Sequence, residues 1–385
     1  MATNLNTFID RRHQFDCAKW TMYPEEVIPL WVADMDFLSP EPVIRALHER
    51  VDHGIFGYQS DSPSLREVLI ERLSKRHHLQ VTSEQITFLP GLVFGLNTVA
   101  RMIGAPGTGV LMNTPIYPPF LSAPKNSDRL VQTAPLASSV TDGILRYELD
   151  FDALEAAVTP DTRLFLLCNP HNPIGRVYTR KELEQIAEFV LRHDLILCAD
   201  EIHCDLTYGD VPHTSIASLS PEIADRTITL LAPSKTFNLP GFGLGFCVIQ
   251  NESLRTNLQE TLHKIGSGVN ALAYTAAEAA YRDGQPWLDE VLAYLKENRD
   301  ALVDFVRETL PDLPITQPEG TYLAWLDCRS LNLQPDPYKF LLDNAHVAFS
   351  SGEAFGAPGF IRINYATTRD TLIEGMNRTA RALGR

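Results

Sequence analysis

The feature that most constrains the fold of this chain is a set of short runs that are apolar at consecutive positions. The segments Leu164–Leu167 and Leu195–Leu197, for example, contain no polar side chain. A strand of this composition is hydrophobic on both faces, which is typical of parallel sheets covered by crossover helices on both sides. Longer amphipathic stretches separate the runs, and this alternation predicts an α/β architecture. The strands expected on this basis are Gln85–Leu89, Val110–Asn113, Arg163–Cys168, Leu195–Ala199, Thr227–Leu231 and Leu244–Ile249.

Helix start signals lie between these runs. Ser62 followed by Pro63 is typical of an N-cap and a first helical position. Thr179 and Glu182 have the spacing of a capping box. Apolar residues at helical spacing follow both signals, so a helix is expected after each. A further, long helix is expected from about residue 286 to 308.

The C-terminal part of the chain has a different pattern, with strand-like pieces around a single helical stretch. These pieces are Tyr322–Leu326, Val347–Ser350 and Phe360–Asn364. A chain of 385 residues suits one large domain plus a smaller one. We therefore expect a large domain over residues 47–284, and a small α+β domain formed by residues 1–46 and 285–385.

Composition excludes several classes of function. The formal net charge of −15 leaves no basic surface to neutralise phosphates, so a nucleic-acid partner is not expected. No apolar run approaches the ~20 residues that span a bilayer, and the N-terminus lacks the apolar region of a signal peptide. The six cysteines include no C-x-x-C pair, and Cys168, Cys198 and Cys247 sit within apolar runs. A reduced, cytoplasmic protein without a membrane segment is therefore expected.

Polar residues follow several of the expected strands at the point where each strand ends. Asn172 comes shortly after one strand, Asp200 directly after the next, and Ser234 and Lys235 after a third. Ligands bind beyond the carboxyl ends of the strands in open parallel sheets, so these side chains are expected to converge on one rim. The turn Pro90–Val93 leads from another strand into a helix expected near Phe94, where backbone N–H groups could hold an anion.

Lys235 and Asp200 are the residues on this rim whose chemistry is most informative. Lys235 has small and apolar neighbours, which favours a Schiff-base lysine with a lowered pKa over an ordinary surface lysine. Asp200 follows an apolar strand and is expected to be buried, where it needs a cationic partner such as a protonated pyridine. Two alternatives are that Asp200 caps a helix, and that Asp200, Glu201 and His203 bind a metal. No further cluster completes a metal site, so no metal is expected.

Three motifs resemble the fold type I aminotransferase superfamily, whose members use pyridoxal 5′-phosphate. They are Asn169–Gly175 (NPHNPIG), Asp200–His203 (DEIH) and Ser234–Asn238 (SKTFN), in the family's order and spacing. The segments Trp31–Phe37 (WVADMDF) and Gly320–Leu326 (GTYLAWL) are most similar to cystathionine β-lyase-like carbon–sulfur lyases. The resemblance covers nearly the whole chain. It implies a mainly parallel seven-stranded sheet in a large domain flanked by helices, plus the smaller α+β domain.

The resemblance also implies roles for individual residues. Lys235 carries the cofactor and moves the Cα proton, Asp200 pairs with the pyridinium nitrogen, and Asn172 bonds the ring's 3′-oxygen. Tyr117 stacks on the ring, and Arg362 grips the substrate carboxylate with a bidentate fork. Without the resemblance, the preferred readings are a core aromatic for Tyr117 and a surface salt bridge for Arg362.

Two positions depart from the aminotransferase pattern. His203 stands where many aminotransferases carry tyrosine, and we expect it to titrate near neutrality beside the 3′-oxygen. Gly243 stands where many carry a phosphate-binding arginine. The resemblance therefore implies that the phosphate is held by Gly91, Leu92, Val93 and Ser234, and by a tyrosine from the partner subunit of a homodimer. Tyr58 matches that tyrosine, which would help bind both cofactor and substrate.

The function implied is β-elimination of an L-cysteine thioether to a thiol, pyruvate and ammonia. An aminotransferase shares the first step, removal of the Cα proton, and remains the main alternative because the residues do not separate the two. A regulatory protein that keeps the fold only to bind an effector is a further alternative. It is less favoured because no DNA-binding helix pair or basic arm accompanies the domain.

Overall fold

The computed structural model describes residues 5–13, 17–209, 211–266 and 268–385. A seven-stranded sheet forms its centre, in the order β2-β10-β9-β8-β7-β3-β4. All neighbouring strands are parallel except at β10, which is antiparallel to both β9 and β2. The strands are β2 (Ile86–Leu89), β3 (Gly109–Thr114), β4 (Leu130–Pro135), β7 (Thr162–Cys168), β8 (Ile196–Asp200), β9 (Thr227–Leu231) and β10 (Gly245–Ile249). The expected fold class is confirmed.

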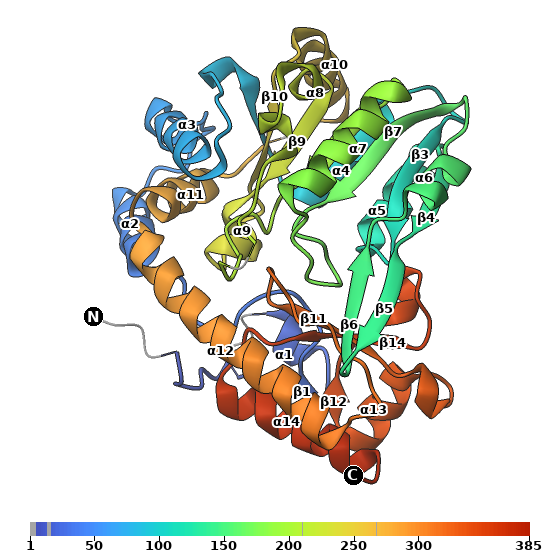
Figure 1. The fold of residues 1–385 in the computed structure, drawn as a ribbon. Coiled ribbons are helices and arrows are strands. Elements are labelled where there is room, and N and C mark those ends of the chain that lie inside the picture. The colour runs from blue at the N-terminus through green and yellow to red at the C-terminus, as the bar shows by residue number, and fades with distance from the viewer. Residues whose placement is uncertain (1–4, 14–16, 210, 267) are drawn as a thin grey trace.

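Helices cover both faces of this sheet (Figure 1), which explains why the strands carry apolar side chains on both faces. Even-numbered positions of β7, such as Leu164 and Leu166, pack in one cluster with residues of α4 and α10. Phe165 and Leu167 point the other way, into a cluster with α6 and α7. The helices around the sheet are α2 (Glu41–His53), α3 (Pro63–His77), α4 (Leu92–Met102), α5 (Pro118–Lys125), α6 (Phe151–Ala157), α7 (Arg180–Arg192), α8 (Pro221–Ala224), α9 (Pro233–Thr236), α10 (Glu252–Ile265) and α11 (Ala271–Asp283).

The helix signals read from the sequence are confirmed. The Ser62 side chain accepts a hydrogen bond from the Leu65 backbone at 3.1 Å and caps α3. Thr179 and Glu182 form the reciprocal capping box of α7. The helix expected near Phe94 begins two residues earlier, at Leu92, with Gly91 as its N-cap at φ +113°. Residues other than glycine rarely adopt that φ angle, so glycine suits this turn.

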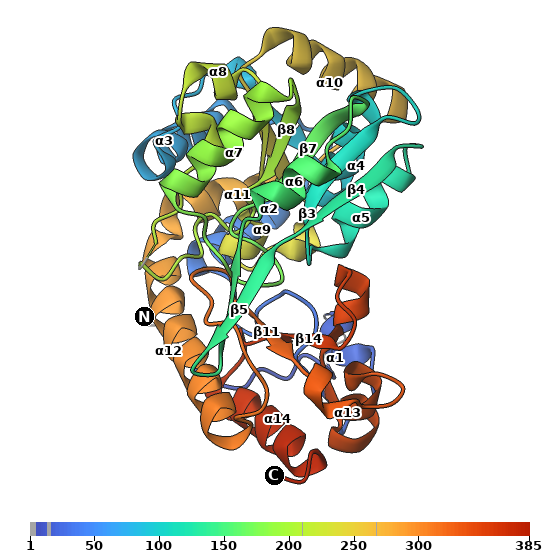
Figure 2. The same ribbon diagram turned by 45° about the vertical axis from the view of Figure 1, so that its right-hand side comes forward.

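Beyond the sheet, the segment with α1 (Ala18–Thr21) and β1 (Ile28–Pro29) lies beside the C-terminal elements, below the sheet in the views of Figures 1 and 2. The long helix α12 (Gln285–Thr309) runs down to this part, where β1 from the N-terminal segment pairs in parallel with β12 (Val347–Ala348). The remaining elements here are β11 (Leu323–Asp327), α13 (Pro337–Ala345), β13 (Ser350–Ser351), β14 (Phe360–Asn364) and α14 (Arg369–Ala382). The piece expected over Val347–Ser350 is therefore two short strands.

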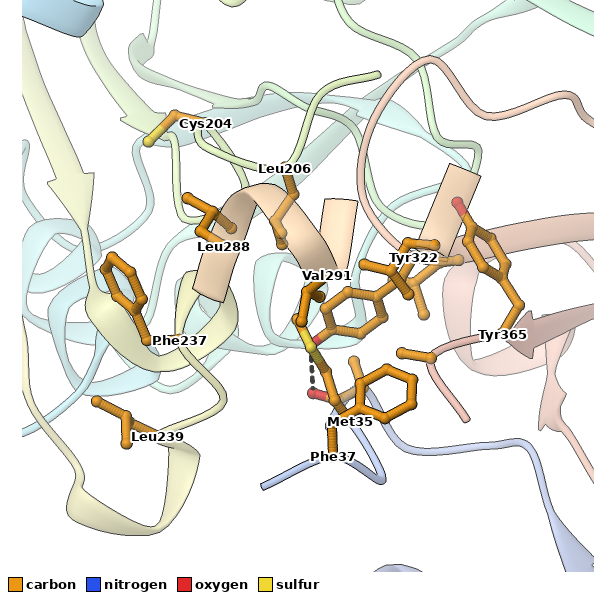
Figure 3. Packing of buried hydrophobic residues seen from close by; sticks show 14 of the residues in the cluster. Met35, Phe37, Cys204, Leu206, Phe237, Leu239, Leu288, Val291, Tyr322 and Tyr365 are labelled. Atoms are coloured by element: carbon orange, nitrogen blue, oxygen red, sulfur yellow. Dashed lines mark hydrogen bonds between the residues drawn. The ribbon is translucent and has the colours of Figure 1, made fainter. Parts of the chain in front are cut away.

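A two-stranded hairpin, β5 (Ala137–Thr141) with β6 (Ile144–Glu148), extends from the sheet toward this part, as Figure 2 shows. One apolar cluster also joins the two parts of the molecule. Figure 3 shows Met35 and Phe37 of the N-terminal segment, Val291 of α12 and Tyr322 gathered in it. Within the described ranges, none of the helices combines the length and apolar character that a bilayer crossing needs.

Candidate functional site

A cavity of about 310 Å³ lies at the carboxyl ends of the sheet strands. Its walls come from segments far apart in the chain, which the parallel strands deliver to one rim. The residues lining it are Ala33, Pro90, Gly91, Leu92, Val93, Phe94, Leu96, Tyr117, Cys168, Asn172, Asp200, Ile202, His203, Ser234, Lys235, Pro240, Gly243 and Leu244. Nine of the eleven residues predicted for the site are therefore placed together; Arg362 and Tyr58 are not among them.

Lys235 projects into this cavity from α9, the short helix after β9. Its Nζ donates a hydrogen bond to the backbone carbonyl of Ala33, so the amine faces the segment Trp31–Phe37. Burial lowers the pKa of Lys235 to about 8, although Asp34 and Asp200 favour the charged form. A lysine in this state is partly neutral near physiological pH and can act as a nucleophile or a base.

Asp200 is the last residue of β8 and is 4% exposed. Its Oδ1 accepts a hydrogen bond from the backbone N–H of Ile202 at 3.1 Å. The residues that follow form turns, so Asp200 does not cap a helix. Burial raises the pKa of Asp200 to about 7, and the attraction of Lys235 does not offset that cost. A cation placed in the cavity would stabilise the ionised carboxylate.

Arg362 lies on β14 and contacts the cavity residue Asn172. Its Nη1 donates to the side-chain oxygen of Asn172 at 3.0 Å, and its Nη2 donates to the Trp31 carbonyl at 2.8 Å and to Ser350 Oγ at 3.1 Å. Burial lowers the pKa of Arg362 to about 10, so the guanidinium stays charged at neutral pH. Its Nε is buried without a hydrogen-bond partner in the described part of the chain. Arg362 is thus a buried residue and not part of a surface ion pair, and its Nε–H donor is unused among the described residues.

Tyr117 is the N-cap residue of α5, and its ring borders the cavity instead of filling a closed core. Burial raises the pKa of its hydroxyl, so the phenol stays protonated. A flat aromatic ring at the edge of such a cavity can stack on a planar ligand.

The start of α4 also lines the cavity. The first N–H groups of a helix have no partner within the helix and can bind an anion, and Leu92 and Val93 begin this one. Ser234 and Gly243 line the same cavity, and Gly243 has φ +62°. An arginine at 243 would have to adopt this left-handed conformation. Lys235 is the only lysine or arginine among the described lining residues.

His203 lines the cavity, but the expectation that it titrates near neutrality is wrong. Burial, followed by the charges of Lys235 and Arg362, holds the pKa of His203 well below its usual range. The imidazole is therefore neutral, and its ring packs edge-on against Tyr322 with centroids 5.8 Å apart. Sequence reasoning placed both cations at the site, but the burial of the ring, which is the main cause, depends on packing by other segments and is not visible in the local sequence.

Tyr58 lies in the exposed loop between α2 and α3, away from the lining of the cavity. A single chain does not bring it to the site. Its surroundings on α2 and the following loop are unusually apolar for a surface. The large hydrophobic side chains exposed there are Ile44, Val51, Ile55 and Phe56.

Two residues that carried no predicted role contribute to the site. The Ala33 carbonyl accepts two hydrogen bonds, one from Lys235 Nζ and one from the hydroxyl of Tyr322 at 3.0 Å. The motifs WVADMDF and GTYLAWL pointed to both segments, but neither identifies a backbone acceptor. Figure 3 shows Tyr322 beside Met35 and Phe37 of that segment.

The arrangement fits pyridoxal 5′-phosphate. The buried carboxylate of Asp200 would be stabilised by a protonated ring nitrogen, and the Lys235 amine is poised to bond an aldehyde. The helix start at Gly91–Val93 can receive a phosphate, and Tyr117 offers a stacking surface. None of these features is specific for pyridoxal 5′-phosphate by itself, but all of them lie in one cavity, and their combination fits this cofactor.

Comparisons with known proteins agree with this fit. Residues 25–378 match the family model described as aminotransferase class I and II. Cystathionine β-lyase PatB of Bacillus subtilis is 37% identical, over 93% of each chain. The crystal structure of OvoB has a TM-score of 0.94 and 43% identity, with 99% of each chain covered. The crystal structure of a PLP-bound C–S lyase from Staphylococcus hominis has a TM-score of 0.92 and 33% identity, covering 100% of this chain and 99% of that one.

Proposed function

This chain belongs to the aminotransferase class I and II family, and on that premise we propose how its residues carry out carbon–sulfur β-elimination. The protein is a pyridoxal 5′-phosphate-dependent carbon–sulfur lyase, which converts an L-cysteine thioether to a thiol, pyruvate and ammonia. The observation that carries the proposal is the placement of Lys235 and Asp200 in one cavity of a chain that is similar to carbon–sulfur lyases over almost its whole length. Lys235 has a pKa lowered to about 8, and Asp200 has a pKa raised to about 7.

These residues would hold the cofactor from several sides. Asp200 would pair with the ring nitrogen, Asn172 would bond the 3′-oxygen, and Tyr117 would stack on the ring. The phosphate would be held by Gly91, Leu92, Val93 and Ser234, all of which line the cavity. When bound, pyridoxal 5′-phosphate supplies an electron sink for the electron pair left at Cα.

The remaining chemistry falls to side chains of this protein. Arg362 would bind the substrate carboxylate through its fork, which fixes the Cα–H bond toward Lys235. The Lys235 amine takes that proton, because a base with a pKa near the working pH is efficient. The Cβ–S bond then breaks, and the proton on Lys235 can pass to the leaving thiolate. Hydrolysis of the remaining enamine gives pyruvate and ammonia.

We further propose a cytoplasmic homodimer in which Tyr58 completes the partner's site. The exposed apolar side chains around Tyr58 support this, since such patches commonly mark interfaces. Cys168, Cys198, Cys204, Cys247 and Cys328 are buried thiols without disulfides, as suits a reducing compartment. We also propose that residues 47–284 form the large domain and that residues 1–46 and 285–385 form the small one.

A product assay tests the proposed function. With L-cystathionine or an S-alkyl cysteine, the purified holoenzyme should release pyruvate, ammonia and a thiol without any added keto acid. An aminotransferase would instead form a keto acid only when a second keto acid accepts the amino group. Fast exchange with 2-oxoglutarate and no pyruvate would replace the lyase by the aminotransferase.

A further inference from the structure

His171 is a fully buried histidine that joins two loops of the cavity wall. It lies in the segment Asn169–Gly175, beside Asn172, and is 1% exposed. Its Nε2 is 2.8 Å from the backbone carbonyl oxygen of Pro115, and its Nδ1 is 2.9 Å from the hydroxyl of Tyr178. Pro115 precedes Tyr117 by two residues, so the imidazole links the loop of Tyr117 to that of Asn172.

The two partners fix the protonation state of the ring. A carbonyl oxygen can only accept, so Nε2 must carry the hydrogen toward Pro115. The Nδ1 atom is then an acceptor, and the Tyr178 hydroxyl donates to it. Burial raises the pKa of Tyr178, which keeps this donor protonated. Burial also lowers the pKa of His171 to about 4, so the ring remains neutral and in this one tautomer at physiological pH.

Both ends of this link are themselves anchored. The backbone N–H of His171 donates to the Arg176 carbonyl at 2.8 Å, and the His171 carbonyl accepts from Gly175 N at 2.8 Å. The backbone N–H of Tyr178 donates to the side chain of Asn169 at 3.0 Å. The imidazole is thus held firmly on the Asn172 side, and the Nε2–H bond transfers that rigidity to the turn at Pro115.

We propose that His171 is a positioning residue that sets the ring of Tyr117 relative to the amide of Asn172. The proposal rests on the proposed function, in which both residues contact the cofactor. The hydrogen bond from Nε2 to Pro115 carries the effect. Without it the turn before α5 loses its tie to the Asn169–Gly175 segment, and Tyr117 no longer meets the cofactor ring in one fixed position.

The test compares His171→Gln with His171→Asn. A glutamine amide can reach the position of Nε2 and donate to Pro115, whereas an asparagine amide stops near the position of Nδ1. The readouts are the dissociation constant for pyridoxal 5′-phosphate and the visible circular dichroism of the bound cofactor. His171→Asn should weaken cofactor binding by about fivefold to tenfold, the size expected for one lost hydrogen bond, and should reduce the dichroic band. His171→Gln should retain most of both.

Tyr178→Phe provides an independent variant should His171→Asn fail to fold. It removes the hydroxyl that holds Nδ1, so the imidazole loses one of its two side-chain hydrogen bonds and is free to tilt away from Pro115; we expect the dichroic band to fall. His193→Asn, at a histidine paired with Glu155 outside the cavity, is the control and should change neither readout. Melting temperatures of the apoproteins report any general loss of stability.

The proposal is overturned if His171→Asn and Tyr178→Phe both keep the full dichroic band and cofactor affinity. It is equally overturned if Gln and Asn at 171 lose the signal alike and in step with melting temperature, because that outcome describes general packing. Failure of the proposed function is distinguishable, since it would appear in the wild-type protein as an absence of pyruvate release.

Discussion

The guanidinium of Arg362 donates to the side-chain oxygen of Asn172 across 3.0 Å. The group proposed to bind the substrate carboxylate is therefore oriented by the group proposed to bond the cofactor ring. Two further bonds, to Trp31 and Ser350, fix the same guanidinium. Arg362 is held ready in a buried position before any substrate arrives, which lowers the ordering cost of binding.

Replacing Arg362 with lysine should therefore impair substrate binding in spite of the retained charge. A lysine amine cannot present a planar fork or make the bonds to both Asn172 and Ser350. We expect kcat/KM to fall by about tenfold to a hundredfold, as for a lost charge-assisted hydrogen bond, mainly through KM. Arg329→Lys, at a largely exposed arginine paired with Asp327, is the matched control. An unchanged KM in Arg362→Lys would remove Arg362 from substrate binding.

Lys235→Ala should abolish both activity and the covalent attachment of the cofactor. The wild-type holoenzyme is expected to absorb near ~420 nm, as is usual for this cofactor bound to a lysine. The variant should lose that band, which a spectrum of the purified protein shows directly. If Lys235→Ala kept full lyase turnover, the assignment of Lys235 would be wrong.

The lowered pKa of Lys235 predicts how attachment depends on pH. Only the neutral amine can bond the aldehyde of the cofactor, and it becomes the main form above a pKa of about 8. Attachment of pyridoxal 5′-phosphate to the apoprotein should therefore accelerate between pH 6 and about 8 and level off above that. Stopped-flow absorbance measures the rate. A rate that still climbs steeply up to about pH 10.4, the ordinary lysine value, would contradict this.

The parts of the fold that could be predicted are those where burial leaves a clear trace in the sequence. The central strands were placed to within one residue because both of their faces are covered. The edge strand β4 was not identified, because its residues are mostly exposed or half-buried and its apolar pattern is weak. Strand β5 is exposed at every position and left no hydrophobic signal at all.

The site shows a similar division. Lys235, Asp200 and Asn172 follow strand ends, where topology alone predicts a ligand. His171 and Tyr322 belong to the same recognisable motifs, yet nothing local separates them from core residues. Their contribution depends on acceptors in other segments, Pro115 and Ala33, and such hydrogen bonds become visible only in three dimensions.

The buried ion pairs of the N-terminal segment predict a large stability effect. Lys19 Nζ lies 2.8 Å from Asp36, which also accepts from Arg11 and from the Trp20 indole, each at 2.8 Å. Lys19→Met leaves part of the Asp36 charge uncompensated and should lower the free energy of unfolding by about 3 kcal/mol at pH 7. Urea denaturation measures it. Lys339→Met, which removes a surface pair with Asp343, should cost less than about 0.5 kcal/mol.

The effect of Lys19→Met should also depend on pH. Burial disfavours the charged form of Asp36, but Lys19, Trp20 and Arg11 outweigh it and lower its pKa. The stability from this pairing is therefore complete above the ordinary aspartate value of about 3.9 and is lost as pH falls through the lower native pKa. The gap between wild type and Lys19→Met should be widest near neutrality and narrow in acid. A gap that widens in acid would show that Asp36 is not the group responsible.

Mixed dimers can establish whether Tyr58 acts across subunits. Tyr58→Ala and Lys235→Ala should each be nearly inactive alone. Random mixing by unfolding and refolding should restore about a quarter of wild-type activity, because half of the dimers would contain one intact site. No restoration is expected if Tyr58 serves its own chain, or if the protein is monomeric. Light scattering on the mixture verifies that dimers are present.

The pairing of β1 with β12 has a consequence for how the protein is made. Ser350 bonds the Trp31 carbonyl, although the two residues are 319 positions apart in the chain. During synthesis the first residues emerge long before those partners exist, whereas the central sheet can assemble as soon as its own strands have left the ribosome. The N-terminal segment, with Ala33 as the acceptor for Lys235, must therefore wait for the end of translation. A nascent chain arrested before residue 347 should hold a formed sheet and no completed cofactor cavity.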